Sequence, residues 1–262
     1  MTYLMESAQE VHRLQAQASA TSYAERLRLT GLRPGDAALD VGCGPGVITS
    51  EMLDVVGPHG RVVGIEPQAA HLAAARGLLA GRPNVELRQG ALPETHLPAD
   101  HFDYVWCQYV FEYLGEPGPA LAELVRVVRP GGRVVVADID GVGLWNWPFP
   151  EDLQEESQKL LAALRAARFD LHAGRKLFHL FRKAGLVDVR VHISPFYVAA
   201  GAVDARLRED WVIRFRTLRP LAEPFFGGAG PYDAFCERFL ALLDDADTLK
   251  YAMVLTTEGV KR

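Results

Sequence analysis

Three glycines, Gly42, Gly44 and Gly46, stand close together after a short apolar run in this chain of 262 residues. The run Ala37–Val41 has the composition of a buried strand and a helical pattern begins at Val47, so the glycines lie in the turn between them. Glycine tolerates positive φ and, because it lacks Cβ, lets a ligand rest against the backbone. The N–H groups that open the following helix favour a carboxylate or a phosphate. The turn therefore predicts a site for a small ligand that carries a negatively charged group.

A carboxylate, Glu66, ends the next apolar run, Arg61–Ile65, roughly 20 residues after the glycines. At the C-terminal tip of a strand, such a carboxylate can accept hydrogen bonds from both hydroxyls of a ribose. An exposed acid that caps a helix is the alternative interpretation. Together, the glycine turn and Glu66 favour a cofactor that contains an adenosyl group.

The glycine spacing argues against two other cofactor classes. A dinucleotide fingerprint would place its third glycine at the position of Val47, one residue later than Gly46. The turn also lacks Lys, Arg and the Lys-Ser/Thr ending of a phosphate-binding loop. A nicotinamide-dependent oxidoreductase on a Rossmann sheet nevertheless stays open as an alternative.

Four segments carry a resemblance to a known family. Leu39–Thr49 and Gly64–Pro67 resemble the first two motifs of the class I S-adenosylmethionine-dependent methyltransferases, and Arg126–Val134 resembles their turn into the fifth strand. Phe102–Tyr113 is similar to the fourth-strand region of their small-molecule subgroup, the type of the ubiquinone and menaquinone biosynthesis methyltransferases. The resemblance covers residues 35–140.

This resemblance implies an α/β fold, a doubly wound three-layer Rossmann-like sheet of seven mostly parallel strands with an antiparallel last strand. The hydrophobic pattern agrees, because short apolar runs alternate with helical stretches. We expect an N-terminal helical cap over 1–34, a cofactor-binding core over 35–200 and 248–262, and a helical insertion over 201–247 as a substrate lid. The further elements expected are strands over Val85–Leu87, Phe102–Cys107, Arg133–Ala137, Val187–Tyr197 and Lys250–Thr257, and helices over 4–30, Glu151–Phe169 and Arg175–Ala184.

Where positions of this sequence match the family's motifs, the resemblance implies a site for S-adenosylmethionine and its product S-adenosylhomocysteine. Glu66 would hold the ribose, Pro67 would pack against adenine, and Gln108 would lie near the methionyl group. Ala91 stands where the family usually has an aspartate, so adenine would keep only backbone contacts from Ala91 and Leu92. The other expected cofactor-binding residues are Asp40, Gly42, Cys43, Gly44 and Gly46 around the methionyl end, and Arg13, which could neutralise the cofactor's carboxylate.

Methyl transfer is an in-line displacement at an already activated sulfonium. Alignment, exclusion of water and, for some acceptors, proton removal are therefore the main tasks of the protein. A base must lie where the strands end, since ligands bind there in open α/β sheets. Tyr109 and Glu112 follow the fourth expected strand, and Asp138 follows the fifth. Glu112 could instead tie its loop to a helix terminus, and whether a general base is used stays open.

Aromatic side chains gather in two later segments. Trp145 and Trp147 belong to an expected glycine- and proline-rich loop, and Trp211 and Phe215 belong to the expected insertion. With Tyr109 they would line a pocket for an apolar or aromatic small molecule, or they would anchor the insertion to the core.

Composition narrows the classes of partner. The net charge is −5, from 28 Lys and Arg against 33 Asp and Glu, so a basic face for nucleic acid is not expected. The Asn/Asp-Pro-Pro-Tyr/Phe motif of base methylation is absent after the fourth expected strand. Three widely spaced cysteines predict neither disulfides nor a metal site. Without a signal peptide or a long apolar segment, the chain is expected to be cytoplasmic, away from membranes, and a monomer or homodimer.

A cofactor-binding member that does not methylate is the third interpretation, because Ala91 departs from the family pattern and no base is assigned.

Overall fold

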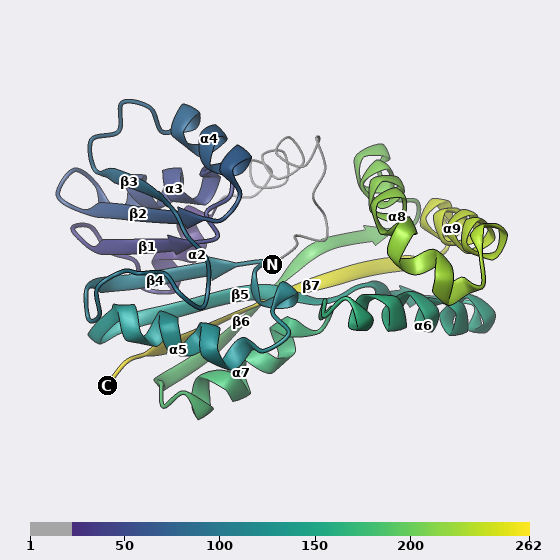
Figure 1. The fold of residues 1–262 in the computed structure, drawn as a ribbon. Coiled ribbons are helices and arrows are strands. Elements are labelled where there is room, and N and C mark those ends of the chain that lie inside the picture. The colour runs from purple at the N-terminus through teal and green to yellow at the C-terminus, as the bar shows by residue number, and fades with distance from the viewer. Residues whose placement is uncertain (1–22) are drawn as a thin grey trace.

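A seven-stranded sheet in the order β3-β2-β1-β4-β5-β7-β6 forms the centre of the protein (Figure 1). The computed structural model describes residues 23–262. Strands β1 to β5 are mutually parallel, whereas β7 is antiparallel to both β5 and β6. This confirms the expected mixed Rossmann-like sheet. The strands are β1 Ala37–Val41, β2 Arg61–Glu66, β3 Val85–Gln89, β4 Phe102–Gln108, β5 Val128–Trp147, β6 Val187–Ala200 and β7 Leu249–Val260.

Helices cover both faces of this sheet, which is why its central strands are apolar at successive positions. Within β4, Val105 packs into one core and its neighbours Tyr104 and Trp106 pack into the other, because successive side chains point to opposite faces. Among the described residues, five helices flank the sheet: α2 Ala24–Leu29, α3 Val47–Val56 and α4 Ala69–Leu78, and, on the opposite face, α5 Pro117–Val127 and α7 Ala173–Lys183.

The lid helices, defined as α6 Glu151–Ala166, α8 Ala205–Phe226 and α9 Ala229–Asp244, form a second group at the far ends of β5, β6 and β7 (Figure 1). They share one apolar cluster, in which the rings of Phe215 and Phe239 lie 5.5 Å apart. The sequence-based division placed 151–166 in the core, but α6 packs against α8 and α9. The lid therefore includes a helix that precedes β6 in the chain.

Strand β5 is much longer than the expected Arg133–Ala137, because it continues through the segment that was expected to be a loop. Gly141 and Gly143 both have positive φ, and the register against β7 shifts between Asp140 and Trp145. Such an irregularity bends a strand without ending it. The pairing with β7 resumes at Trp145 and carries the strand to the lid helices.

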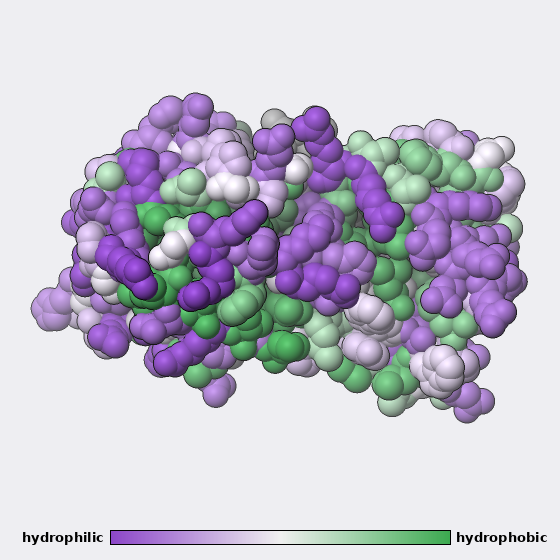
Figure 2. Space-filling model, turned by 90° about the horizontal axis from the view of Figure 1, so that it is seen from below, coloured by the Kyte–Doolittle hydropathy of each residue, from purple (hydrophilic) through white to green (hydrophobic). Residues whose placement is uncertain are grey.

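The expected helix over 4–30 and the cap over 1–34 lie mostly outside the described residues. Of that segment the structure shows α2, whose Leu27 is fully buried against the sheet. No helix between residues 23 and 262 is long and apolar enough to cross a membrane. Figure 2 shows hydrophobic and hydrophilic side chains intermingled on the face seen from below.

Lys250 is buried where the lid returns to the sheet, and we predict that it stabilises this connection. Its Nζ donates to the carbonyl oxygens of Gly201 at 2.9 Å, Asp245 at 2.7 Å and Thr248 at 3.3 Å. Lys250→Met would leave these carbonyls without their donor, so we expect the free energy of unfolding to fall by about 2 kcal/mol. Urea denaturation checks this against Lys183→Met, an exposed lysine on α7. Equal stability of the two variants would contradict the prediction.

Candidate functional site

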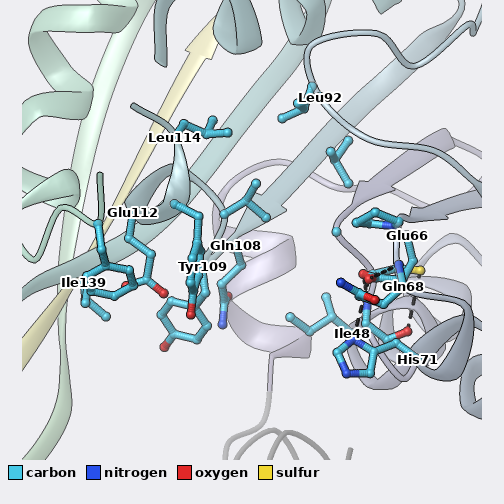
Figure 3. A pocket seen from close by; sticks show the side chains of 18 of the residues that line it. Ile48, Glu66, Gln68, His71, Leu92, Gln108, Tyr109, Glu112, Leu114 and Ile139 are labelled. Atoms are coloured by element: carbon cyan, nitrogen blue, oxygen red, sulfur yellow. Dashed lines mark hydrogen bonds and ion pairs between the residues drawn. The ribbon is translucent and has the colours of Figure 1, made fainter. Parts of the chain in front are cut away.

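A cavity of about 320 Å³ opens beside the C-terminal ends of β1 and β4 and extends to the lid helices. One half is lined by the glycine turn, Glu66 and the segment after β3, and the other half by the turn after β4 and by apolar side chains of α6 and α8. In Figure 3 the labelled side chains run from Glu66, Gln68 and His71 at one end, past Gln108 and Tyr109, to Glu112 and Ile139 at the other.

The glycine turn forms the floor of the first half. Gly44 has a φ of 53° and lines the cavity, and no other atom of residues 23–262 lies within 4 Å of the place where a Cβ would stand. A Cβ on Gly42 would instead lie 2.6 Å from Val110 Cγ2, so this glycine lets the turns after β1 and β4 approach each other. Gly46 does not line the cavity, because it packs against Ala75 of α4. Of the three expected glycines, Gly42 and Gly44 face the site and Gly46 supports it.

Glu66 ends β2 and bridges the glycine turn to the start of α4. Its Oε2 accepts from the backbone N–H of Gly44 at 3.0 Å, and its Oε1 accepts from the N–H of Gln68 at 2.9 Å. Nδ1 of His71 lies 3.5 Å from the same Oε1. The carboxylate is thus held in the cavity wall beside the turn, at the C-terminal tip of β2.

Asp40 lies at the end of β1 with its carboxyl buried under the glycine turn. Its Oδ2 accepts from the hydroxyl of Thr49 at 2.6 Å. Burial raises its pKa from 3.8 to about 7, against the opposing effect of the Thr49 hydrogen bond, and the negative charge of Glu66 raises it further. The neighbouring Cys43 thiol also lines the cavity, and burial raises its pKa well above the ordinary value. The thiol stays protonated and is a poor nucleophile.

Two consecutive residues, Gln108 at the end of β4 and Tyr109 directly after it, divide the cavity into its halves. Gln108 donates from Nε2 to the hydroxyl of Tyr23 at 3.1 Å, while its buried Oε1 accepts no hydrogen bond within the described residues. Tyr109 has a φ of 56°, a strained value for a side chain of this size, and its ring packs edge-on to Phe196. Burial raises the pKa of Tyr109 well above its ordinary value, so its phenol stays protonated at neutral pH.

The other two candidate bases differ in position. Glu112, in the short helix η1 Phe111–Tyr113, lines the cavity. Asp138 does not line it: its oxygens accept from the backbone N–H groups of Glu112 at 3.1 Å and Ile139 at 2.8 Å. Burial raises the pKa of Asp138. The structure corrects its expected role, because this carboxyl fixes the backbone of η1 rather than facing a ligand.

The aromatic residues expected in the substrate pocket separate into two groups. Tyr109 and Trp211 line the cavity. Trp145 instead stacks on Tyr251 at 6.4 Å, and 78% of Trp147 is exposed to solvent. Phe215 lies in the core of the lid helices and faces α9 rather than the cavity. The structure therefore corrects the expected pocket role of Trp145, Trp147 and Phe215.

Pro67, Ala91 and Leu92 line the end of the cavity beside Glu66, where an adenine was expected. Arg13 lies outside the described residues. Within residues 23–262 no group of three or more His, Cys, Asp or Glu could hold a metal ion. All three cysteines are free thiols.

Sequence reasoning missed the lid side of the cavity. Arg214 and Leu218 line it together with Trp211, at a spacing of three and seven residues along α8. That spacing places the three on one helix face and was the available signal. Other lining residues that sequence reasoning missed include Leu160 and Leu164 of α6, and Phe169, Leu171 and Phe196.

Comparisons with known proteins identify similar chains among methyltransferases. The family model described as "Methyltransferase domain" matches residues 39–136. A demethylmenaquinone methyltransferase of Staphylococcus aureus is 30% identical over 182 residues, which cover 65% of this chain and 76% of that protein. An uncharacterized 37.1 kDa protein in transposon TN4556 of Streptomyces fradiae is 38% identical over 108 residues, 41% of this chain.

The solved structure of a Haemonchus contortus phosphoethanolamine N-methyltransferase 2, in complex with phosphomonomethylethanolamine and S-adenosylhomocysteine, has the same fold. Its TM-score is 0.58 at 18% identity, and the match covers 94% of this chain and 52% of that one. The chain thus spans about half of the Haemonchus protein, and its match covers 31% of the Streptomyces relative.

Proposed function

This chain belongs to the class I S-adenosylmethionine-dependent methyltransferases, and we propose that it transfers a methyl group from S-adenosylmethionine to a small organic acceptor. The observation that carries the proposal is the joint position of Gly44 and Glu66. Both face one cavity, and the Glu66 carboxylate is fixed 3.0 Å from the Gly44 backbone N–H.

The described residues fit the cofactor by shape and by hydrogen-bonding capacity. The open space above Gly44 admits a ligand against the backbone. The buried Oε1 of Gln108 accepts no hydrogen bond from the described residues, and it would accept from the ammonium group of the methionyl end. Glu66 would accept from the ribose hydroxyls, and Pro67 and Leu92 supply apolar surface for adenine.

When bound, S-adenosylmethionine would supply a methyl group on a positively charged sulfur, and the sulfur would leave as a neutral thioether when the acceptor bonds to the methyl carbon in line. The contribution of the chain is to align the acceptor and to exclude water. We call the half of the cavity beside Gly44 and Glu66 the cofactor half, and the half beside the lid helices the acceptor half. The apolar residues Leu160, Leu164 and Leu218 of the lid helices cover the acceptor half. Tyr109 stays protonated and can donate a hydrogen bond, so Glu112 is the candidate proton acceptor where an acceptor must lose a proton.

Calorimetric titration with S-adenosylhomocysteine tests the proposal. We expect the wild type to bind it and Glu66→Ala to bind at least about tenfold more weakly, because charge-assisted hydrogen bonds to the ribose are lost. Glu94→Ala, an exposed carboxylate outside the cavity, should bind like the wild type. Undetectable binding by the wild type, or unchanged binding by a folded Glu66→Ala variant, would refute the proposal.

A further inference from the structure

One cation reaches the acceptor half of the cavity. Among the titratable side chains that line the cavity within the described residues, Arg214 of α8 is the single Arg or Lys. The lid side of the cavity around it is formed by apolar side chains, among them Leu218 one helical turn further along and Trp211 one turn before, while Glu112 lines the opposite side. A guanidinium is thus set into a wall that otherwise suits a hydrocarbon or an aromatic ring.

Two other arginines of α8 form ion pairs with carboxylates, and Arg214 differs from them in this respect. Arg208 pairs with Asp244 at 2.9 Å, and Arg219 pairs with Glu223 and Asp233. No carboxylate between residues 23 and 262 forms an ion pair with Arg214, although its side chain is half-buried. A partly desolvated cation gains more from an anion than an exposed one does, since water screens less of the attraction.

The position of the guanidinium is fixed by aromatic packing. It lies 5.8 Å from the centre of the Trp211 ring, a distance at which a cation is attracted to the ring face. Trp211 is itself held by Phe239 at 4.8 Å and by Gly143, where a Cβ would lie 2.4 Å from the indole. The Trp211 ring therefore favours a position of the guanidinium beside the cavity wall.

We propose that the acceptor is an apolar molecule that carries an anionic group, a carboxylate or a phosphate, and that Arg214 binds this group. The planar guanidinium offers two parallel N–H donors, a geometry that matches both anions. The apolar residues then hold the body of the acceptor between Arg214 and the cofactor half. This inference rests on the proposed function and adds to it the chemical class of the acceptor and the residue that selects it.

Matched probes test the inference on the full chain: 4-phenylbutyrate, 4-phenylbutyl phosphate and the neutral 4-phenylbutanamide. We expect one or both anions to bind the wild type about tenfold more tightly than the amide, and the tighter anion identifies the class of acceptor. Arg214→Gln should reduce this preference to less than about twofold, and Arg214→Lys should restore part of it because the charge returns. Arg216→Gln, two residues along the same helix, exposed and outside the cavity, should keep the full preference.

The titrations are made with and without S-adenosylhomocysteine, so that the two proposals can fail separately. A wild type that does not bind S-adenosylhomocysteine overturns the proposed function, while the anion preference is still read in the unliganded protein. Equal or undetectable binding of the anions and the amide overturns the assignment of Arg214. So does an anion preference that survives Arg214→Gln.

Discussion

Replacing Gly44 by leucine should weaken S-adenosylhomocysteine binding by at least about 100-fold while the protein still folds. Gly44 stands on the cavity floor, and in the described part of the chain no atom lies within 4 Å of the place where its Cβ would stand. A leucine side chain would fill the volume in which the cofactor must contact the backbone. Its φ of 53° makes the substitution cost about 1–2 kcal/mol of stability as well. Calorimetry and urea denaturation measure the two effects separately.

A matched variant separates blocked binding from backbone strain. Gly185 follows α7 with a φ of 80° and lies outside the cavity, and its Cβ would also meet no atom of the described residues within 4 Å. Gly185→Leu should therefore lose comparable stability and keep full affinity for S-adenosylhomocysteine. If Gly44→Leu is folded and binds within about threefold of the wild type, the cofactor does not rest on this turn.

The cofactor half of the site could be predicted because its signals are local in sequence. A buried strand, a glycine turn and a helix follow one another within residues 37–56, and Glu66 comes at the end of the next strand. Local pattern also reveals which strands are buried on both faces. Gly46 shows the limit of that reasoning, since the sequence does not distinguish a glycine that faces a ligand from one that packs against Ala75.

The acceptor half depends on contacts between distant segments. β5 runs past two glycines because β7, more than 100 residues later, supplies its partner. That pairing places Trp145 on Tyr251 and leaves Trp147 in solvent, although the two tryptophans look alike in sequence. Arg214 has the appearance of a surface arginine until α6 and α8 close over the cavity. Long-range pairing of this kind overrides local propensity.

Asp40→Asn should flatten the pH dependence of stability between pH 4 and pH 8. Burial raises the pKa of the folded-state carboxyl from 3.8 to about 7, so in this range the folded state holds a proton that the unfolded state has released. The contribution of protonated Asp40 to the free energy of unfolding is complete below pH 3.8. It is lost as the pH rises through about 7, because ionisation of the carboxyl in the buried site is costly. The difference in the pKa of Asp40 between the folded and unfolded states corresponds to about 4 kcal/mol of stability.

Asparagine keeps an oxygen that can accept from Thr49 but does not titrate. Urea denaturation at intervals of one pH unit should show the wild type losing stability relative to Asp40→Asn as the pH rises. Asp103 provides a control of opposite sign: burial alone would raise its pKa, but hydrogen bonds from Ala37 and Arg129 hold it below 3.8. Asp103→Asn should therefore run parallel to the wild type above pH 5, since both states are then ionised. Parallel curves for the wild type and Asp40→Asn would instead mean that Asp40 is already ionised in the folded protein at low pH, and that its negative charge is present in the cavity throughout this range.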